Sequence, residues 1–214
     1  MGESFFMTDS NVKVFVEGEG TQSTLLERIQ KQDAEGWKTF VRLYTPLLFQ
    51  WCRRAGLQDT DAADVAQDVF YAVSKSIATF SREREGGTFR GWLRTITTNK
   101  IRDRHRLNVP GAYGVGGDDG MTVTHEAPEA REPFSAADAH GPEDELTLMR
   151  RAVEIVLGDY EEHTRAAFLR VTMGEESAAD VARDLNMTVN VVYLAKSRIM
   201  RRIREEFAGL IETL

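Results

Sequence analysis

The sequence has 214 residues, with 27 Lys and Arg against 34 Asp and Glu, so its formal net charge is −7. Hydrophobic residues make up 42% of the chain, which is enough for a real core in one or two small domains and excludes disorder of the whole chain. Cys52 is the only cysteine, which excludes an internal disulfide and a Cys-rich zinc site and fits a reducing, cytoplasmic setting. Residues 1–20 resemble neither a signal peptide nor a membrane span of about 20 apolar residues, so we expect a soluble protein without membrane insertion.

The acidic residues are concentrated in one segment. Residues 108–145 contain nine acids and one basic residue, together with four of the five prolines and the run GAYGVGGDDG. Such a composition is typical of a linker. We therefore expect an all-α protein with two small helical domains joined by a flexible linker. Its parts are an unassigned N-terminal extension over 1–21, a helical domain over 22–107, an acidic linker over 108–142 and a helix-turn-helix domain over 143–214.

The first domain begins with two stretches of helical periodicity. Apolar residues recur at helical spacing from Leu25 to Cys52, where Pro46 marks a kink or a break. Over residues 61–80 the apolar positions follow the i, i+3, i+4 rule and leave an acidic ridge, which taken alone is as well explained by a solvated helix face. An EF-hand loop starting at Asp59 is excluded, because Asp64 stands where glycine is required and Phe70 where glutamate is required. The ridge contains Asp61, Asp64, Gln67 and Asp68.

Residues 89–107 form the more informative helix of this domain. At about 100° per residue one side of it is apolar, and the opposite side is a narrow stripe of polar residues and arginines. Residues 82–106 carry eight basic residues against three acids, a local excess that favours phosphate binding inside an acidic protein. Trp92 lies at the edge of the apolar side, where it either belongs to the core or stacks on an unpaired nucleobase. The apolar side contains Phe89, Trp92, Leu93, Ile96 and Leu107, and the stripe contains Thr95, Thr98, Asn99, Arg102 and Arg106.

The second domain has the grammar of a helix-turn-helix. A short helix over 161–173 ends at Gly174 as a C′ glycine, and Ser177 caps the next helix. Asn186 tolerates the left-handed conformation of a tight turn, and Thr188 caps a longer basic helix that runs to about Phe207. The alternative is a two-helix corner with a charged outer face. The residues expected to face inward from the last helix are Val192, Ile199 and Ile203.

Three strings of the sequence resemble known motifs. DVAQDVFYAVSKSIATF over 64–80 and FRGWLRTITTNKIRDRHR over 89–106 resemble region 2 of the extracytoplasmic-function (ECF) sigma factors, a group of the sigma-70 family. SAADVARDLNMTVNVVYLAKSRIMRRIRE over 177–205 resembles their region 4. The resemblance implies an alternative sigma factor that binds core RNA polymerase, directs it to specific promoters and helps to open the −10 element. It further implies no catalytic residues, no metal and no cofactor, with an anti-sigma protein as a further candidate partner.

The resemblance also implies three sets of site residues. Polymerase binding falls on Asp64, Gln67 and Asp68. Binding of the −10 element falls on Arg82, Arg84, Trp92, Thr95, Thr98, Asn99, Arg102 and Arg106. Binding of the −35 element falls on Thr188, Asn190, Tyr193, Lys196, Ser197, Arg198, Arg201 and Arg202. In the last set, outward geometry favours Asn190, Tyr193 and Ser197 for base edges and Lys196, Arg198, Arg201 and Arg202 for phosphates.

Two departures and two alternatives accompany this interpretation. Lys100 stands on the apolar side of its helix where the family usually has an apolar residue, and Ala195 and Lys196 exchange the usual basic and apolar positions. One alternative is a stand-alone helix-turn-helix regulator that binds duplex DNA without polymerase. The other is a metal-dependent enzyme that cleaves phosphodiesters. Its carboxylates would be Asp59, Asp61, Asp64 and Asp68.

Overall fold

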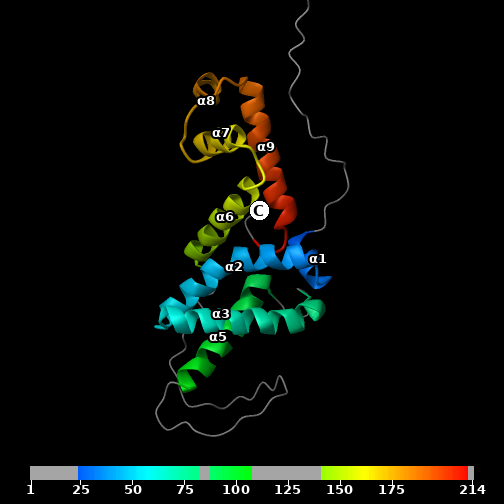
Figure 1. The fold of residues 1–214 in the computed structure, drawn as a ribbon, viewed down its shortest axis with the longest axis vertical. Helices are drawn as coiled ribbons and strands as arrows, with labels where there is room; N and C mark the ends of the chain where they lie inside the picture. The colour runs from blue at the N-terminus through cyan, green and yellow to red at the C-terminus, as the bar shows by residue number, and fades with distance from the viewer. Residues whose placement is uncertain (1–23, 82–86, 108–140, 212–214) are drawn as a thin grey trace, which may run out of the picture.

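The computed structural model describes residues 24–81, 87–107 and 141–211, and these confirm the all-α prediction. The expected N-terminal extension and most of the expected linker lie outside the described residues. Two helical bodies are formed, one from α1 to α5 and one from α6 to α9 (Figure 1). In chain order the elements are α1 (Leu25–Gln30), α2 (Ala34–Arg54), α3 (Asp59–Ser76), the 3-10 helix η1 (Ile77–Thr79), α5 (Phe89–Leu107), α6 (Pro142–Leu157), α7 (Glu162–Thr172), α8 (Ala178–Asp184) and α9 (Val189–Glu206).

The N-terminal body packs α2, α3 and α5 around large aromatic side chains. Phe40 on α2 and Phe89 on α5 are fully buried, and their rings meet edge-on with centroids 5.8 Å apart. Edge-to-face contacts of this kind stabilise aromatic cores beyond the area that they bury. The apolar side of α3 faces this core as its periodicity predicted. Its buried residues are Ala62, Val65, Ala66, Val69 and Val73.

Pro46 does not break its helix, because α2 runs without interruption from Ala34 to Arg54. A proline has no N–H and so leaves the carbonyl one turn earlier without its helical donor. Here that carbonyl belongs to Arg42, and it accepts a hydrogen bond from Arg151 Nε of α6 at 2.9 Å. Of the two predicted outcomes, a kink or a break, the structure excludes the break, and a side chain from a distant helix satisfies the group that the proline leaves open.

The caps predicted for the second domain are present. Ser177 precedes α8 and its hydroxyl oxygen accepts from the Asp180 N–H at 3.1 Å, and Thr188 precedes α9 and accepts from the Val191 N–H at 3.3 Å. Asn186 has a φ of 52°, the left-handed conformation predicted for the turn between them. The residues predicted to face inward from α9 are all fully buried. They are Val192, Ile199 and Ile203.

Gly174 follows α7, but it is not the residue with the left-handed backbone. The positive φ belongs to Glu175, at 53°. A Cβ on Gly174 would lie 2.7 Å from the carbonyl oxygen of Arg170, closer than real Cβ contacts come. Glycine is therefore required here by a close backbone approach, and the expected reason for it is corrected accordingly.

The two bodies pack against each other on α2. In Figure 1, α6 and the end of α9 lie on one side of α2 while α3 and α5 lie on the other. Leu148 and Val156 of α6 belong to the same buried apolar cluster as Leu48 of α2. The hydroxyl of Tyr44 on α2 donates to the Leu210 carbonyl at 2.9 Å, beyond the end of α9. The sequence analysis did not predict this contact between the bodies.

Candidate polymerase and nucleic-acid interfaces

Three of the four residues of the acidic ridge on α3 are exposed as predicted, and the fourth, Asp61, is half-buried. Asp64, Gln67 and Asp68 are one helical turn apart and all exposed. Asp64 Oδ2 also accepts a hydrogen bond from Arg104 Nη2 of α5 at 3.0 Å, and the same guanidinium forms an ion pair with Asp61. The hydrogen bonds that Arg104 donates to Asp61 raise the pKa of Arg104 above its ordinary value. Ion pairs with Arg104 therefore tie the start of the ridge to the last turns of α5.

The carboxylates proposed for a phosphodiester-cleaving enzyme do not gather around a metal position. Asp59 pairs with Arg53 at 2.5 Å, and Asp61 and Asp64 both pair with Arg104. Within the residues that the structure describes, no cluster of His, Cys, Asp and Glu is arranged to hold a metal ion. A metal site made of two carboxylates needs both groups to face a common centre. Here the carboxylates are instead paired with two different arginines.

The polar stripe of α5 is largely open to solvent. Thr95, Asn99 and Arg106 are exposed, and Thr98 and Arg102 are half-buried on the same helix. Arg82 and Arg84, the other members of the expected −10 set, lie outside the described residues. The stripe thus presents hydroxyl, amide and guanidinium groups side by side, which are groups that bind phosphates and base edges.

Trp92 is packed on the core, which is the first of the two alternatives considered for it. It packs against the core aromatics, with ring centroids 4.8 Å from Phe80 and 5.4 Å from Phe89, and it stays half-buried. Because the ring is not fully buried, stacking on an unpaired nucleobase stays a prediction. Since Thr95 and Asn99 follow it by three and seven residues, it lies next to the stripe.

Arg90 and Arg94 are not part of the exposed basic surface. Their exposed fractions are 3% and 5%, and they lie away from the stripe at about 100° of rotation per residue. Arg90 pairs with Glu145 of α6, and Arg94 lies 3.7 Å from the Asp144 carboxylate with its guanidinium 5.5 Å from the Trp51 ring centroid. A count of charges along the segment could not show this, because both residues are paired with acids of another helix.

Leu107 and Lys100 also refine the expected apolar side of α5. Leu107 was assigned to that side but is 75% exposed. It ends the helix, and the last buried residue of α5 is Ile101, so the core does not extend this far. Lys100 is half-buried beside Ile101, as expected for a long stem that packs while its charged end reaches water.

The exposed side of α9 carries the residues proposed to contact base edges. Asn190, Tyr193 and Ser197 are exposed and follow one another at three and four residues. Arg198 and Arg201 are exposed on the same helix, and Lys196 is half-buried. Ala195 is buried, which accounts for a small side chain at this position. Thr188, the remaining member of the set, is exposed with its oxygen engaged in the cap.

Arg202 differs from the other arginines of α9. It is bound by Asp159 at 2.5 Å and by Glu206 at 3.5 Å, and its guanidinium lies 5.8 Å from the centroid of the Tyr160 ring. Burial acts to lower the pKa of Arg202, but the hydrogen bond with Asp159 raises it overall. This guanidinium connects α9 to the turn after α6 and is less available to DNA than its neighbour Arg201.

The turn before α8 is held by a second ion network. Arg170 of α7 binds Glu176 and, at 2.7 Å, Asp184 at the end of α8. The hydrogen bond from Arg170 lowers the pKa of Glu176, and those from the Ser177 hydroxyl and from Arg183 lower the pKa of Asp180. These contacts fix α8 against α7 and so set the position from which α9 starts.

Comparison with known proteins gives one matching family model and several similar sigma factors. A family model described as Sigma-70 region 2 matches residues 40–108. The chain is 25% identical over 181 residues to the ECF RNA polymerase sigma factor SigW of Bacillus subtilis, covering 82% of this chain and 89% of that protein. It is 27% identical over 167 residues to the RNA polymerase sigma factor CnrH of Cupriavidus metallidurans, covering 77% and 81%. The solved structure of CnrH in complex with the cytosolic domain of CnrY matches with 22% identity and a TM-score of 0.35, covering 84% of this chain and 92% of that one.

The segment that includes α3, α5 and most of α2 is therefore a sigma-70 region 2 domain, and the protein is a sigma factor. Over most of its length it is similar to an extracytoplasmic-function sigma factor, SigW. As a sigma factor it acts with core RNA polymerase in transcription initiation and is not an enzyme. Among the helices of the described residues, none combines the length and the apolar character needed to cross a membrane.

Proposed function

We propose that this sigma factor directs core RNA polymerase to specific promoters through three separate surfaces. The ridge of Asp64, Gln67 and Asp68 binds the polymerase. The stripe of α5 with Trp92 holds the opened −10 element, and the exposed side of α9 binds the −35 element. The corresponding domains are region 2 over 22–107 and region 4 over 143–214, joined by the linker over 108–142, and the protein acts in the cytoplasm.

The observation that carries the proposal is the division of α9 into two sides. Val192, Ile199 and Ile203 are fully buried, while Asn190 and Tyr193 project into solvent from the first turns of the helix. In a helix-turn-helix the N-terminal part of the second helix enters the major groove and contacts base edges. The cap at Thr188 and the left-handed turn at Asn186 hold α9 in the orientation that such docking needs.

The role of α5 rests on stacking beside a basic stripe. Capture of unpaired strand requires aromatic platforms and cations along the backbone, with each stacked base contributing about 1–3 kcal/mol. Trp92 supplies a ring anchored on Phe80 and Phe89, and Arg102 and Arg106 follow on the same helix. Duplex recognition by α9 and single-strand capture by α5 then act together, since the first aligns the polymerase and the second stabilises the open strand.

Membership in the sigma factors favours this role over that of a stand-alone regulator. The test is promoter-specific run-off transcription with purified protein and core RNA polymerase on a pool of genomic promoters. We expect discrete transcripts that depend on the added protein. Tight duplex binding by the protein alone, with no transcript from any promoter, would support the regulator instead. Co-purification of a second protein that suppresses the transcripts would identify an anti-sigma partner.

A further inference from the structure

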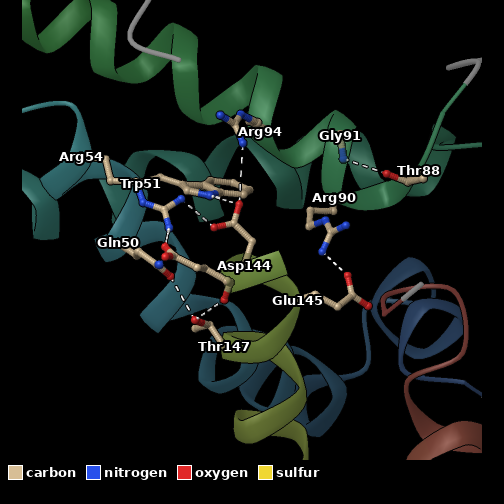
Figure 2. A network of polar contacts seen from close by, with 11 residues as sticks. Gln50, Trp51, Arg54, Thr88, Arg90, Gly91, Arg94, Asp144, Glu145 and Thr147 are labelled. Atoms are coloured by element: carbon tan, nitrogen blue, oxygen red, sulfur yellow. Dashed lines mark hydrogen bonds and ion pairs between the residues drawn. The ribbon is translucent and has the colours of Figure 1, made fainter. Parts of the chain in front are cut away.

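The first turn of α6 inserts a buried carboxylate between two helices of the region 2 body. Asp144 is fully buried, and its two oxygens accept hydrogen bonds from Trp51 Nε1 and Arg54 Nη1, each at 2.8 Å (Figure 2). Arg94 Nη1 of α5 lies 3.7 Å from the same carboxylate. All three partners belong to α2 or α5, so the charge of Asp144 is compensated entirely across the contact between the bodies.

The two residues that flank Asp144 also pair with arginines of the region 2 body. Glu143 pairs with Arg54 at 2.7 Å. Glu145 pairs with Arg90, as Figure 2 shows. Three consecutive acids thus meet three arginines of the region 2 body. Composition grouped these three acids with the acidic segment 108–145, but they belong to a helix and have specific partners.

Other polar contacts align the bodies along α2. Arg151 donates to the Arg42 carbonyl that Pro46 leaves open, and Tyr44 donates to the Leu210 carbonyl. The bond from Tyr44 is buried, so it satisfies a hydroxyl and a carbonyl that water does not reach. The contact is therefore a formed interface with matched donors and acceptors and not only an apolar collapse.

The site that receives the acids is chemically a phosphate site. Guanidinium groups bind carboxylate and phosphate oxygens in the same geometry, and region 2 presents three of them together with an indole N–H. Arg90 and Arg94 lie on α5, the helix of the proposed −10 stripe, on either side of Trp92 in the sequence. With α6 in place, these cations are neutralised by three carboxylates.

The connection between the bodies is long enough for them to separate. It comprises the 33 residues 108–140, a length that can span up to roughly 115 Å when extended, whereas connections between helices packed on each other usually need about 2–8 residues. The proposed working surfaces stay exposed when the bodies are closed, since Asp68, Asn99 and Tyr193 are all solvent-accessible. Closure therefore neutralises arginines of α5 and limits how far α9 can move away from region 2. It leaves the ridge, the stripe and the exposed side of α9 uncovered.

We propose that Glu143, Asp144 and Glu145 form an intramolecular latch: they occupy a basic site made by Arg54, Arg90 and Arg94 on region 2, and opening of the latch frees this site for promoter phosphates. Closure of the latch does not depend on the DNA-binding role. The use of the freed arginines by DNA rests on the proposed function.

The test compares D144N/E145Q with E161Q/E162Q, which makes the same change in charge at the exposed start of α7. Radius of gyration by X-ray scattering reports closure, and binding of oligo(dT) over a salt series reports the arginines. We expect the latch variant to expand, and its log affinity to fall with log salt more steeply by about 2, at about 0.7 per phosphate contact for three arginines. The control should match the wild-type protein in both measurements.

Each result bears on a different part of the proposal. An unchanged radius of gyration in the latch variant overturns the latch. Expansion with an unchanged salt slope overturns the phosphate role of Arg54, Arg90 and Arg94. Promoter-specific transcription by the wild-type protein tests the proposed function separately, so its failure would be distinguishable from both.

A cross-linked form keeps the proposal testable if the latch variant does not fold. Thr147 Oγ1 of α6 lies 3.1 Å from Gln50 Oε1 of α2, so Q50C/T147C joined by a short bismaleimide holds the bodies closed. Cys52 should not react, because burial raises the pKa of its thiol to about 11. We expect the cross-linked protein to bind oligo(dT) several-fold more weakly than the same protein before cross-linking. Equal binding by the two forms would overturn the proposal.

Discussion

Two aspartates on the same exposed ridge differ in what a substitution would disturb. Asp64 is bound by Arg104, so changing it would also release the contact between α3 and α5. Asp68 is exposed one turn later, and no described residue forms an ion pair with it. Asp68 is therefore the residue at which polymerase binding can be tested without altering the fold.

We expect Asp68→Lys to weaken binding to core RNA polymerase by at least about 10-fold, because a reversed charge on an electrostatically complementary surface is strongly unfavourable. Helix content and thermal unfolding should be unchanged. Affinity can be measured by fluorescence anisotropy of labelled protein titrated with core polymerase. Glu162→Lys, an equal change of charge on exposed α7, is the control. Wild-type affinity in the Asp68→Lys protein would remove the ridge from the polymerase-binding surface.

The ridge also shows what the sequence could and could not predict about single residues. Exposure of Asp64, Gln67 and Asp68 follows from helical periodicity, which is local. The pairing of Asp64 with Arg104 joins residues 40 positions apart and depends on how α3 and α5 cross. No local pattern contains that information, so the coupling of the two helices appears only in the structure.

At the scale of single helices, α9 combines a DNA-facing side with an anchor. Arg201 is 70% exposed in its side chain and forms a 3.9 Å ion pair with Glu205 on the same helix. Arg202 is instead held by Asp159 and Glu206. Both neighbouring arginines were expected to bind phosphates, but the structure favours different roles for them.

We expect Arg201→Ala to weaken binding to −35 duplexes to the same extent for all sequences and to reduce the salt slope by about 0.9, as one lost phosphate contact does. Arg202→Ala should instead lower the free energy of unfolding by about 1 kcal/mol, because it removes a partly buried ion pair and the cation–π contact with Tyr160. Binding of duplex variants over a salt series and urea unfolding measure the two effects. A changed sequence preference in Arg201→Ala would assign that residue to base contacts.

The helix boundaries of the second domain were largely predictable because caps are local. Ser177, Asn186 and Thr188 each act within a few residues of their position, through a hydrogen bond or a backbone conformation. The burial of Arg90 and the exposure of Leu107 could not be predicted in this way. Arg90 is buried by α6 of the other body, and Leu107 extends past the core of its own body. Periodicity predicts on which side of a helix a residue lies, but it does not predict which other element packs against that side.

At the scale of the whole molecule, the two bodies share one apolar cluster. It joins Leu47 of α2 with Leu148 of α6 and with Phe207 at the end of α9. The composition of the chain predicted two domains and a linker but gave no sign that they would pack on each other. The residues that make the contact are ordinary core positions of amphipathic helices, and each has a partner only in the assembled fold.

A shared core predicts cooperative unfolding of the two bodies. We expect the wild-type protein to give one transition in scanning calorimetry, because opening the contact exposes apolar surface of both. Trp51→Phe keeps most of the ring volume but removes the donor to the buried Asp144 carboxylate. The loss should cost about 1–3 kcal/mol at the contact and separate the unfolding into two transitions.

Trp37→Phe is the matched control for this experiment, since Trp37 lies on the same helix and packs on Phe40 within the N-terminal body. It should lower the midpoint of unfolding and keep a single transition, because it weakens one body without removing a contact between the two. Two transitions in the wild-type protein would contradict a shared core. A single transition in Trp51→Phe would show that the apolar cluster couples the bodies without the hydrogen bond to Asp144, and the contribution of the latch to the closed form would then be small.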